Sequence, residues 1–256
     1  MSDFNISTNK PSVRLLTGGK YCEQDIVVET NVDAYSQGYD TGITDTHSDY
    51  LARGLTEIRF PSGITSLQQY AFYQQNKIKG VITFPNTLTT IGAYAFRECS
   101  GITELHGAGV TSIGNYTFYG NTALTVADFP KLKTSGTYAF EYCTKLTEMN
   151  LPSLTAVPGN FIYRSTNIEK VDLSVCTSIA ANGFRGASGL DKLIIRTPSV
   201  CSLANTNAFT SDTPIYKGTG YVYVPDDLVD SYKAATNWST YATRIKPISE
   251  LEVVEE

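Results

Sequence analysis

Apolar residues return at a fixed spacing along most of the chain. An aromatic or aliphatic anchor recurs every 22 to 25 residues, and three further apolar positions lie eight before, five before and six after it. The anchors are Phe72, Phe96, Phe118, Phe140, Ile162, Phe184 and Phe209. The position eight before holds Ile64, Leu88, Val110, Leu132, Leu154, Cys176 and Cys201, and the position five before holds Leu67, Ile91, Ile113, Ser135, Val157, Ile179 and Ala204. The position six after holds Ile78, Ile102, Leu124, Leu146, Ile168, Leu190 and Ile215. No single unit can bury these side chains, so the pattern predicts stacked coils around one continuous core.

Each unit also carries a short stretch in which alternate residues are small or apolar. Examples are Leu105 with Gly107, Ala127 with Phe129, and Leu193 with Ile195. Alternation with a period of two predicts a short strand. Stacked units then place these strands in a parallel sheet on one face, about 4.8 Å apart.

The two ends of the chain do not repeat. At the C-terminus, the pattern predicts a strand at residues 221–225, a helix at 226–238 capped by Asp226, and a strand at 244–248. At the N-terminus, residues 13–28 read as two short strands around Gly18 and Gly19. A helix is expected after Ala34, with one seam formed by Tyr39, Ile43, Thr46 and Tyr50. This helix is expected either to cap the first repeat or to associate with copies of itself.

The repeated phrase resembles a known family. The sequence LTTIGAYAFREC at residues 88–99, with its copies between Gly54 and Gly218, resembles the BspA-like leucine-rich repeat, and residues 219–248 resemble that family's closing segment. The resemblance implies a β-rich (α/β) repeat solenoid with a parallel sheet on one face and non-repeat caps. It divides the chain into an attachment or capping module at 1–53, a solenoid of about seven coils at 54–218, and a C-terminal cap with an acidic tail at 219–256.

A second, shorter resemblance concerns the N-terminal module. The phrase GGKYCEQDIVV at residues 18–28, followed by a segment rich in Gly and Tyr, is similar to linker segments of phage and prophage tail-structural proteins. It suggests a virion or prophage-encoded binding protein.

Composition narrows the classes of partner. The formal net charge is −5 and the pI is about 5.1, which disfavours binding to nucleic acid or to an anionic membrane surface. No apolar run of about 18 residues predicts a transmembrane helix. The first residues lack an apolar signal core, so we expect synthesis in the cytosol unless a signal sequence precedes them.

The residues that carry most acid–base chemistry are scarce. The only histidines are His47 and His106, and both are expected to be surface residues without a metal. Phosphate-loop, zinc-protease and serine-hydrolase motifs are missing from the sequence. We therefore expect a protein that is not an enzyme and needs no cofactor.

The five cysteines are Cys22, Cys99, Cys143, Cys176 and Cys201. Cys99 and Cys143 hold the same repeat position two coils apart, with Asn121 between them, which is too far for a disulfide. Cys176 and Cys201 lie in adjacent coils. They are interpreted either as two buried thiols that replace leucine or as a disulfide.

Two groups of polar positions flank the anchor. Two residues before it stand Tyr70, Tyr94, Tyr116 and Tyr138, then Asn160, Asn182 and Asn207. This ladder is interpreted as stacked scaffold side chains or as part of a binding surface. One or two residues after the anchor stand Tyr73, Arg97, Tyr119, Tyr142, Tyr163, Arg164 and Arg185. These vary between coils, which suits exposed positions, and they are the candidate partner-binding residues.

Two classes of function follow from these observations. The first is a binding or adhesion protein that recognises a protein or a cell-surface glycan. It would be either a tail-associated virion component or a bacterial surface or secreted adhesin. The second is a structural spacer in a larger assembly. A homotrimer formed through residues 1–53 would favour the virion role. In either class, Gly114 is expected to permit a tight turn or close packing between coils.

Overall fold

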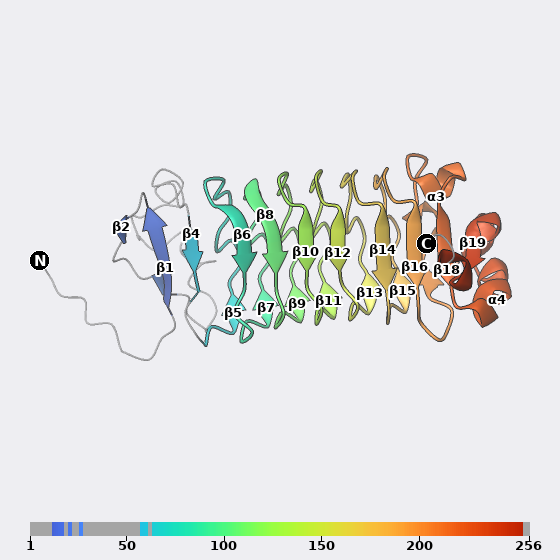
Figure 1. Cartoon of the computed structure of the whole chain (residues 1–256), viewed down its shortest axis with the longest axis horizontal. Coiled ribbons are helices and arrows are strands. Elements are labelled where there is room, and N and C mark those ends of the chain that lie inside the picture. Colours follow the sequence, from blue (N-terminus) through green and yellow to red (C-terminus); the bar gives the residue numbers. More distant parts are fainter. Residues whose placement is uncertain (1–11, 18–19, 22–25, 28–56, 61–62, 253–256) are drawn as a thin grey trace, which may run out of the picture.

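A computed structural model describes residues 12–17, 20–21, 26–27, 57–60 and 63–252 of the 256-residue chain. From residue 63 onward the chain winds into coils that stack side by side along one long axis (Figure 1). Segments 22 to 24 residues apart become neighbours, as in the pairs Glu104 with Val126 and Ser178 with Ser202. The predicted β-rich repeat solenoid is confirmed.

The longer strands form a parallel ladder along one face. Their order is β6–β8–β10–β12, followed by β14–β16–β18–β19. Their bounds are β6 Lys79–Thr83, β8 Gly101–His106, β10 Val126–Asp128, β12 Glu148–Asn150, β14 Lys170–Leu173, β16 Lys192–Ile195, β18 Tyr221–Val224 and β19 Ile245–Pro247. Leu105, Ala127 and Leu193 are fully buried, so the predicted alternation and the predicted sheet are both confirmed.

A second ladder of two-residue strands lies on another side of the coils. These strands are β5 Ser66–Leu67, β7 Thr90–Ile91, β9 Ser112–Ile113, β11 Thr134–Ser135, β13 Ala156–Val157, β15 Ser178–Ile179 and β17 Ser202–Leu203. All the observed pairings within this ladder are parallel. Two residues are too few to produce a period of two, so the sequence did not reveal these strands.

The core runs without interruption through all the coils. Every anchor is buried, and neighbouring rings pack at centroid distances of 4.9 Å for Phe72 and Phe96 and 5.2 Å for Phe118 and Phe140. One predicted core position is wrong, because Ala204 is exposed. The last unit is longer, and Leu203 pairs with Ile179 in the strand register, so Leu203 takes the inward place.

Residues three positions after the anchor form a ladder of side-chain hydrogen bonds inside the turns. The Cys99 thiol donates to the Phe72 carbonyl at 2.9 Å, and the Asn121 amide donates to the Phe96 carbonyl at 2.8 Å. Cys143 and Ser165 donate in the same way to the anchors Phe118 and Phe140. Each side chain satisfies a buried carbonyl of the preceding coil, and this requirement accounts for Cys, Asn and Ser at one position.

The C-terminal segment closes the last coil. It comprises η1 Thr206–Ala208, α3 Pro214–Lys217, η2 Asp226–Leu228, α4 Val229–Ala234, η3 Trp238–Arg244 and α5 Ser249–Glu252. The Tyr232 hydroxyl accepts from the Cys201 amide, and the Trp238 indole donates to the Cys201 carbonyl. Because no further coil follows, these side chains take the hydrogen bonds that another coil would have made.

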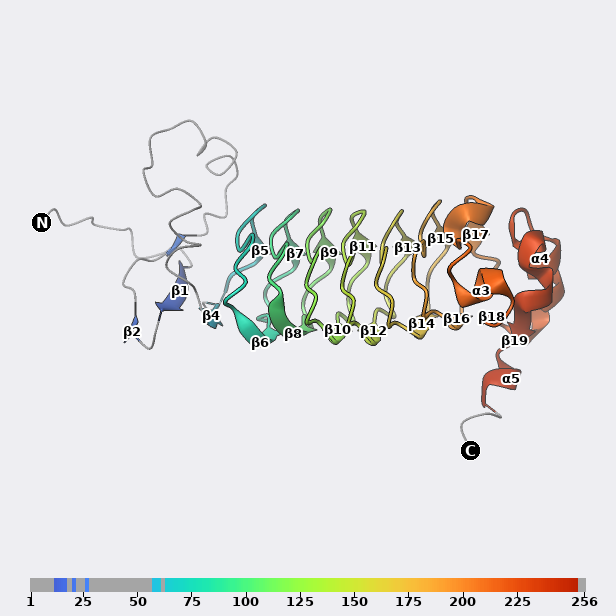
Figure 2. The same ribbon diagram turned by 90° about the horizontal axis from the view of Figure 1, so that it is seen from above.

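The predicted order of strand, helix and strand is present in this segment, but the predicted Asp226 cap is wrong. The helical stretch is split into η2, α4 and η3, and neither η2 nor α4 has a side-chain cap. The Asp226 carboxylate instead accepts from the Ser249 amide at the start of α5. Figure 2 shows α5 projecting on the side of the long strands, where Leu251 packs with Ile194 and Tyr223.

At the N-terminus, strands β1 Ser12–Thr17 and β2 Lys20–Tyr21 flank residues 18–19 and pair antiparallel, as predicted. Strands β3 Ile26–Val27 and β4 Glu57–Arg59 also pair antiparallel with β1. The predicted helix, with Tyr39, Ile43, Thr46 and Tyr50, lies outside the described residues, as do Cys22 and His47.

Candidate functional site

The turns between each short strand and the next long strand repeat one backbone conformation. The residues two before the anchor have φ between 55° and 62° in six successive coils, from Tyr70 to Asn182. The residues two after the anchor also have positive φ, from Gln74 to Gly186. Glycine and asparagine adopt this left-handed region readily, whereas bulky residues adopt it at a cost. A Cβ at Gly114 would lie 2.4 Å from the Ala93 backbone nitrogen, so that glycine serves close packing between coils.

Four tyrosines occupy the first of these left-handed positions and stack on one another. Ring centroids lie 4.9 Å apart for Tyr70 and Tyr94, 5.0 Å for Tyr94 and Tyr116, and 4.7 Å for Tyr116 and Tyr138. The interplanar angles fall from 18° to 3° along the stack. Because the faces cover each other, the stack presents ring edges to solvent.

A second row of aromatic and basic side chains runs beside this stack. Tyr73 packs edge-on against Tyr70, Tyr119 lies 5.9 Å from Tyr116, and Tyr142 contacts Tyr119 and Tyr163. We call the two rows together the tyrosine–arginine band. It comprises Tyr70, Tyr73, Tyr94, Arg97, Tyr116, Tyr119, Tyr138, Tyr142, Tyr163, Arg164 and Arg185.

Arginine guanidinium groups lie between the tyrosine rings of the second row. The Arg97 guanidinium lies 4.6 Å from the Tyr119 ring centroid and 5.6 Å from that of Tyr73. Arg164 lies 5.2 Å from Tyr142 and 5.0 Å from Tyr163, and it also donates to the Tyr142 hydroxyl. Arg185 lies 5.2 Å from Tyr163. Such cation–π contacts hold the guanidinium groups in fixed orientations.

The charges within the band are partly balanced. Arg97 forms an ion pair with Glu98 at 3.1 Å, and Glu98 accepts from the Gln74 amide. Glu141 is only 6% exposed. Burial raises the pKa of its carboxyl group, while Arg164 and Arg97 act in the opposite direction. Burial also raises the pKa of Tyr116 and Tyr119, so their hydroxyls keep their protons and remain hydrogen-bond donors.

The structure brings all seven candidate binding residues into the band. Arg164 and Arg185 are exposed, whereas Tyr73, Arg97, Tyr119, Tyr142 and Tyr163 are half-buried. The expectation that these positions are exposed is confirmed for Arg164 and Arg185 and is wrong for the five half-buried residues, because the side chains cover one another. Sequence reasoning missed the left-handed backbone. A readable signal was the presence of asparagine in the later coils two before the anchor, and of glycine in two coils two after it.

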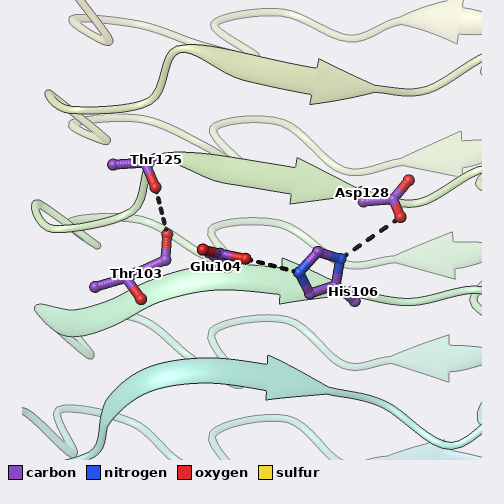
Figure 3. A network of polar contacts seen from close by, with 5 residues as sticks. All are labelled: Thr103, Glu104, His106, Thr125 and Asp128. Carbon is purple, nitrogen blue, oxygen red and sulfur yellow. Dashed lines mark hydrogen bonds and ion pairs between the residues drawn. The ribbon is translucent and has the colours of Figure 1, made fainter.

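A second polar cluster lies on the face of the long strands (Figure 3). His106, at the end of β8, contacts Glu104 at 3.0 Å and Asp128 of β10 at 3.6 Å. The hydrogen bond to Glu104 is the largest of the influences that raise the pKa of His106. His106 is a half-exposed surface residue, as expected, and its partners come from its own strand and from the next coil.

The described cysteines are all free and buried. Cys99 and Cys143 are unpaired, as predicted, and burial raises the pKa of the Cys99 thiol to about 12. Between the two readings of Cys176 and Cys201, the structure supports buried thiols. The Cys176 thiol donates to the Ser178 carbonyl, and the nearby Cys176 thiol, together with burial, raises the pKa of Cys201.

In the part of the chain that the structure describes, no three His, Cys, Asp or Glu side chains are grouped so that they could hold a metal ion. Among the same residues, none of the helices has the length and apolar character needed to cross a bilayer.

One family model and two solved structures are similar to this chain. The model of the "BspA type Leucine rich repeat region" matches residues 49–154 and 111–217, in six copies. A leucine-rich repeat protein of T. pallidum is 18% identical with a TM-score of 0.45, covering 65% of this chain and 85% of its own. One from Bacteroides ovatus is 14% identical with a TM-score of 0.27, covering 73% and 76%. No curated protein matches this sequence. Since the repeat model covers well over half of the sequence, the chain belongs to the BspA-type leucine-rich repeat family.

Proposed function

We propose that the protein is a non-enzymatic binding protein that recognises a receptor through the tyrosine–arginine band. One observation carries the proposal. Bulky tyrosine and arginine side chains occupy left-handed positions that Asn160, Asn182, Gly120 and Gly186 fill at lower backbone cost in other coils. Strain of this kind is retained where the side chain has a role.

The composition of the band supports a binding role. Tyrosine and arginine are enriched in the energetically dominant parts of protein interfaces, because they give large contact area and several hydrogen bonds at a small entropy cost. The core below the band and the ladder of backbone bonds between coils hold the side chains in register. A rigid frame reduces the entropy lost on binding.

The test is capture of receptor from cell envelopes by the full chain. The band variant carries Tyr73→Ser, Tyr119→Ser, Tyr142→Asn and Tyr163→Ser, with asparagine at 142 because φ is 58° there. The control is Tyr216→Ser, since Tyr216 is 55% exposed and lies outside the band. We expect the wild type and the control to retain the same species and the band variant to lose it. Equal recovery by all three proteins would contradict the proposal.

The biological setting is a finer part of the proposal. The similarity of residues 18–28 to tail-structural linkers favours a phage or prophage virion component, with residues 1–53 as the attachment and trimerisation module. The alternative settings are a bacterial surface or secreted adhesin and a structural spacer. Light scattering of the full chain separates these settings. A stable trimer supports the virion component if the substitutions Tyr39→Asp and Ile43→Asp convert it to a monomer. A monomeric wild type argues for the adhesin.

A further inference from the structure

The C-terminal half of the band presents two exposed guanidinium groups, Arg164 and Arg185, and Arg164 interacts electrostatically with the buried Glu141. Among the described residues, neither Arg164 nor Arg185 forms an ion pair with a carboxylate, whereas Arg97 is paired with Glu98 and Arg196 with Asp172. Both side chains are exposed. The two guanidinium groups come from adjacent coils of a chain with a net charge of −5, and both lie near the ring of Tyr163, so they can bind one anionic partner together.

The tyrosine ring beside Arg164 and Arg185 limits which sides of their guanidinium groups a ligand can reach. Arg164 and Arg185 both lie near Tyr163, with guanidinium carbons 5.0 Å and 5.2 Å from its ring centroid. A guanidinium group has five N–H donors in one plane, and such a group binds carboxylate or sulfate oxygens in pairs. One nitrogen of Arg164 donates to the Tyr142 hydroxyl. Because both guanidinium groups already lie against the Tyr163 ring, recognition here depends on their hydrogen-bond donors rather than on stacking of the ligand on that ring.

The backbone at this edge offers little to an extended peptide. Tyr142 N–H donates to the Tyr163 carbonyl, Asn160 N–H to the Asn182 carbonyl, and Phe184 N–H to the Ala208 carbonyl. These bonds join each turn to the next coil, so strand addition, which requires free main-chain groups, is not available at these positions. A ligand held by side-chain donors alone suits a polymer whose own polar groups are hydroxyls and anionic substituents.

We infer that the Tyr142, Tyr163, Arg164 and Arg185 part of the band is a subsite for the carboxylate or sulfate groups of an acidic polysaccharide. The inference rests on the proposed function and names the ligand class of the same surface. Guanidinium groups on adjacent coils engage the anionic substituents, and the Tyr142 hydroxyl lies beside them. Glu141, which is buried and acts electrostatically on Arg164, opposes the anion, so its removal is expected to strengthen binding.

The test measures binding of the full chain to four immobilised polymers by biolayer interferometry at low salt. Heparin supplies sulfate groups, polygalacturonate supplies carboxylate groups, dextran is the neutral control, and poly-glutamate is the acidic peptide. We expect binding to heparin or to polygalacturonate, and the stronger of the two identifies the anionic group. Dextran and poly-glutamate are expected to bind at least about tenfold more weakly.

Variants connect the binding to the subsite. Arg185→Gln and Arg164→Asn are each expected to weaken binding about tenfold, because a charge-assisted bond is lost. Asparagine is chosen at 164 because φ is 58° there. Arg196→Gln removes the same charge from another face and is expected to leave binding within about twofold, since exposed distant charges are screened. Glu141→Gln is expected to tighten binding.

Three results would overturn the inference: no binding to either acidic polysaccharide, equal binding to poly-glutamate, or equal effects of Arg185→Gln and Arg196→Gln. The proposed function has its own readout in the envelope capture. If polysaccharide binding fails while capture remains dependent on the band tyrosines, only the ligand class is wrong. If capture is also independent of them, the band is not the binding surface.

Discussion

The coils with anchors Phe72 to Phe140 and the coils with anchors Ile162 and Phe184 form the same left-handed turn with different residues. Both sets hold the residue two before the anchor at a φ near 60°. The first set uses Tyr70, Tyr94, Tyr116 and Tyr138, and the second uses Asn160 and Asn182. Asparagine adopts this conformation at low cost, whereas tyrosine adopts it here with its ring stacked on its neighbours. The difference teaches that the solenoid requires the left-handed turn but does not require the tyrosine.

The largest expected effect tests whether the two sets share the same core. Phe118→Ala and Phe184→Ala each remove a fully buried ring and are expected to lower the free energy of unfolding by about 3–5 kcal/mol. Chemical denaturation followed by circular dichroism measures both. If one of the two substitutions lowers the free energy of unfolding by less than half as much as the other, the cores of the two sets of coils are not equivalent.

The next effect separates backbone strain from stacking. Tyr116→Asn loses the contacts with Tyr94 and Tyr138 but relieves the strain of the left-handed backbone. We therefore expect it to lower the free energy of unfolding by about 1 kcal/mol. Tyr116→Ile loses the same contacts and places a β-branched residue at a φ of 55°, so we expect it to lower the free energy of unfolding by about 3 kcal/mol. Thermal and denaturant unfolding would rank the two variants. Equal losses would mean that backbone conformation does not decide the residue at this position.

A smaller effect tests whether stacking makes tyrosine tolerable. Asn160→Tyr would extend the stack beyond Tyr138, so the gained ring contact is expected to offset the lost asparagine preference to within about 0.5 kcal/mol. Asn160→Ile has no ring to stack and is expected to cost about 1–3 kcal/mol. If Asn160→Tyr proves as costly as Asn160→Ile in the same melts, the stack does not compensate for the strain.

The smallest effect concerns the sheet face, where the two sets of coils differ again. The first set places His106 between Glu104 and Asp128, whereas the second pairs Asp172 with Arg196. Because the folded pKa of His106 is raised, its contribution is fully present below the unfolded pKa of about 6.5 and is lost as pH rises through the higher folded value.

The corresponding measurement compares melting temperatures across this pH window. The difference between wild type and His106→Gln is expected to shrink toward zero as the pH rises above 6.5, by a degree or so because the site is half-exposed. The difference between wild type and Arg196→Gln is expected to stay constant, since that pair contains no histidine. A His106→Gln difference that does not change with pH would contradict the assignment.

The sequence by itself determined the repeat, the core and the sheet. The anchors from Phe72 to Phe209 recur with a period that only stacked coils can bury, and side chains such as Leu105 and Ala127 alternate as a half-buried strand must. The periodicity of the apolar residues along the chain is sufficient for these conclusions. The one core position that failed, Ala204, lies where the last unit lengthens and the register with Ile179 selects Leu203 instead.

Only the tertiary structure decided how the polar positions are used. The residues one and two after the anchor look equivalent in sequence, yet only the second of them has a positive φ. The backbone N–H of that second residue donates to the next coil, as Tyr142 does to the Tyr163 carbonyl. That geometry unites Tyr116 and Tyr119 in one band and buries Glu141. It also leaves Arg164 and Arg185 exposed, with guanidinium carbons 5.0 Å and 5.2 Å from the Tyr163 ring centroid. Periodicity fixes which residues face the core, whereas contacts between coils determine which polar side chains meet on the surface.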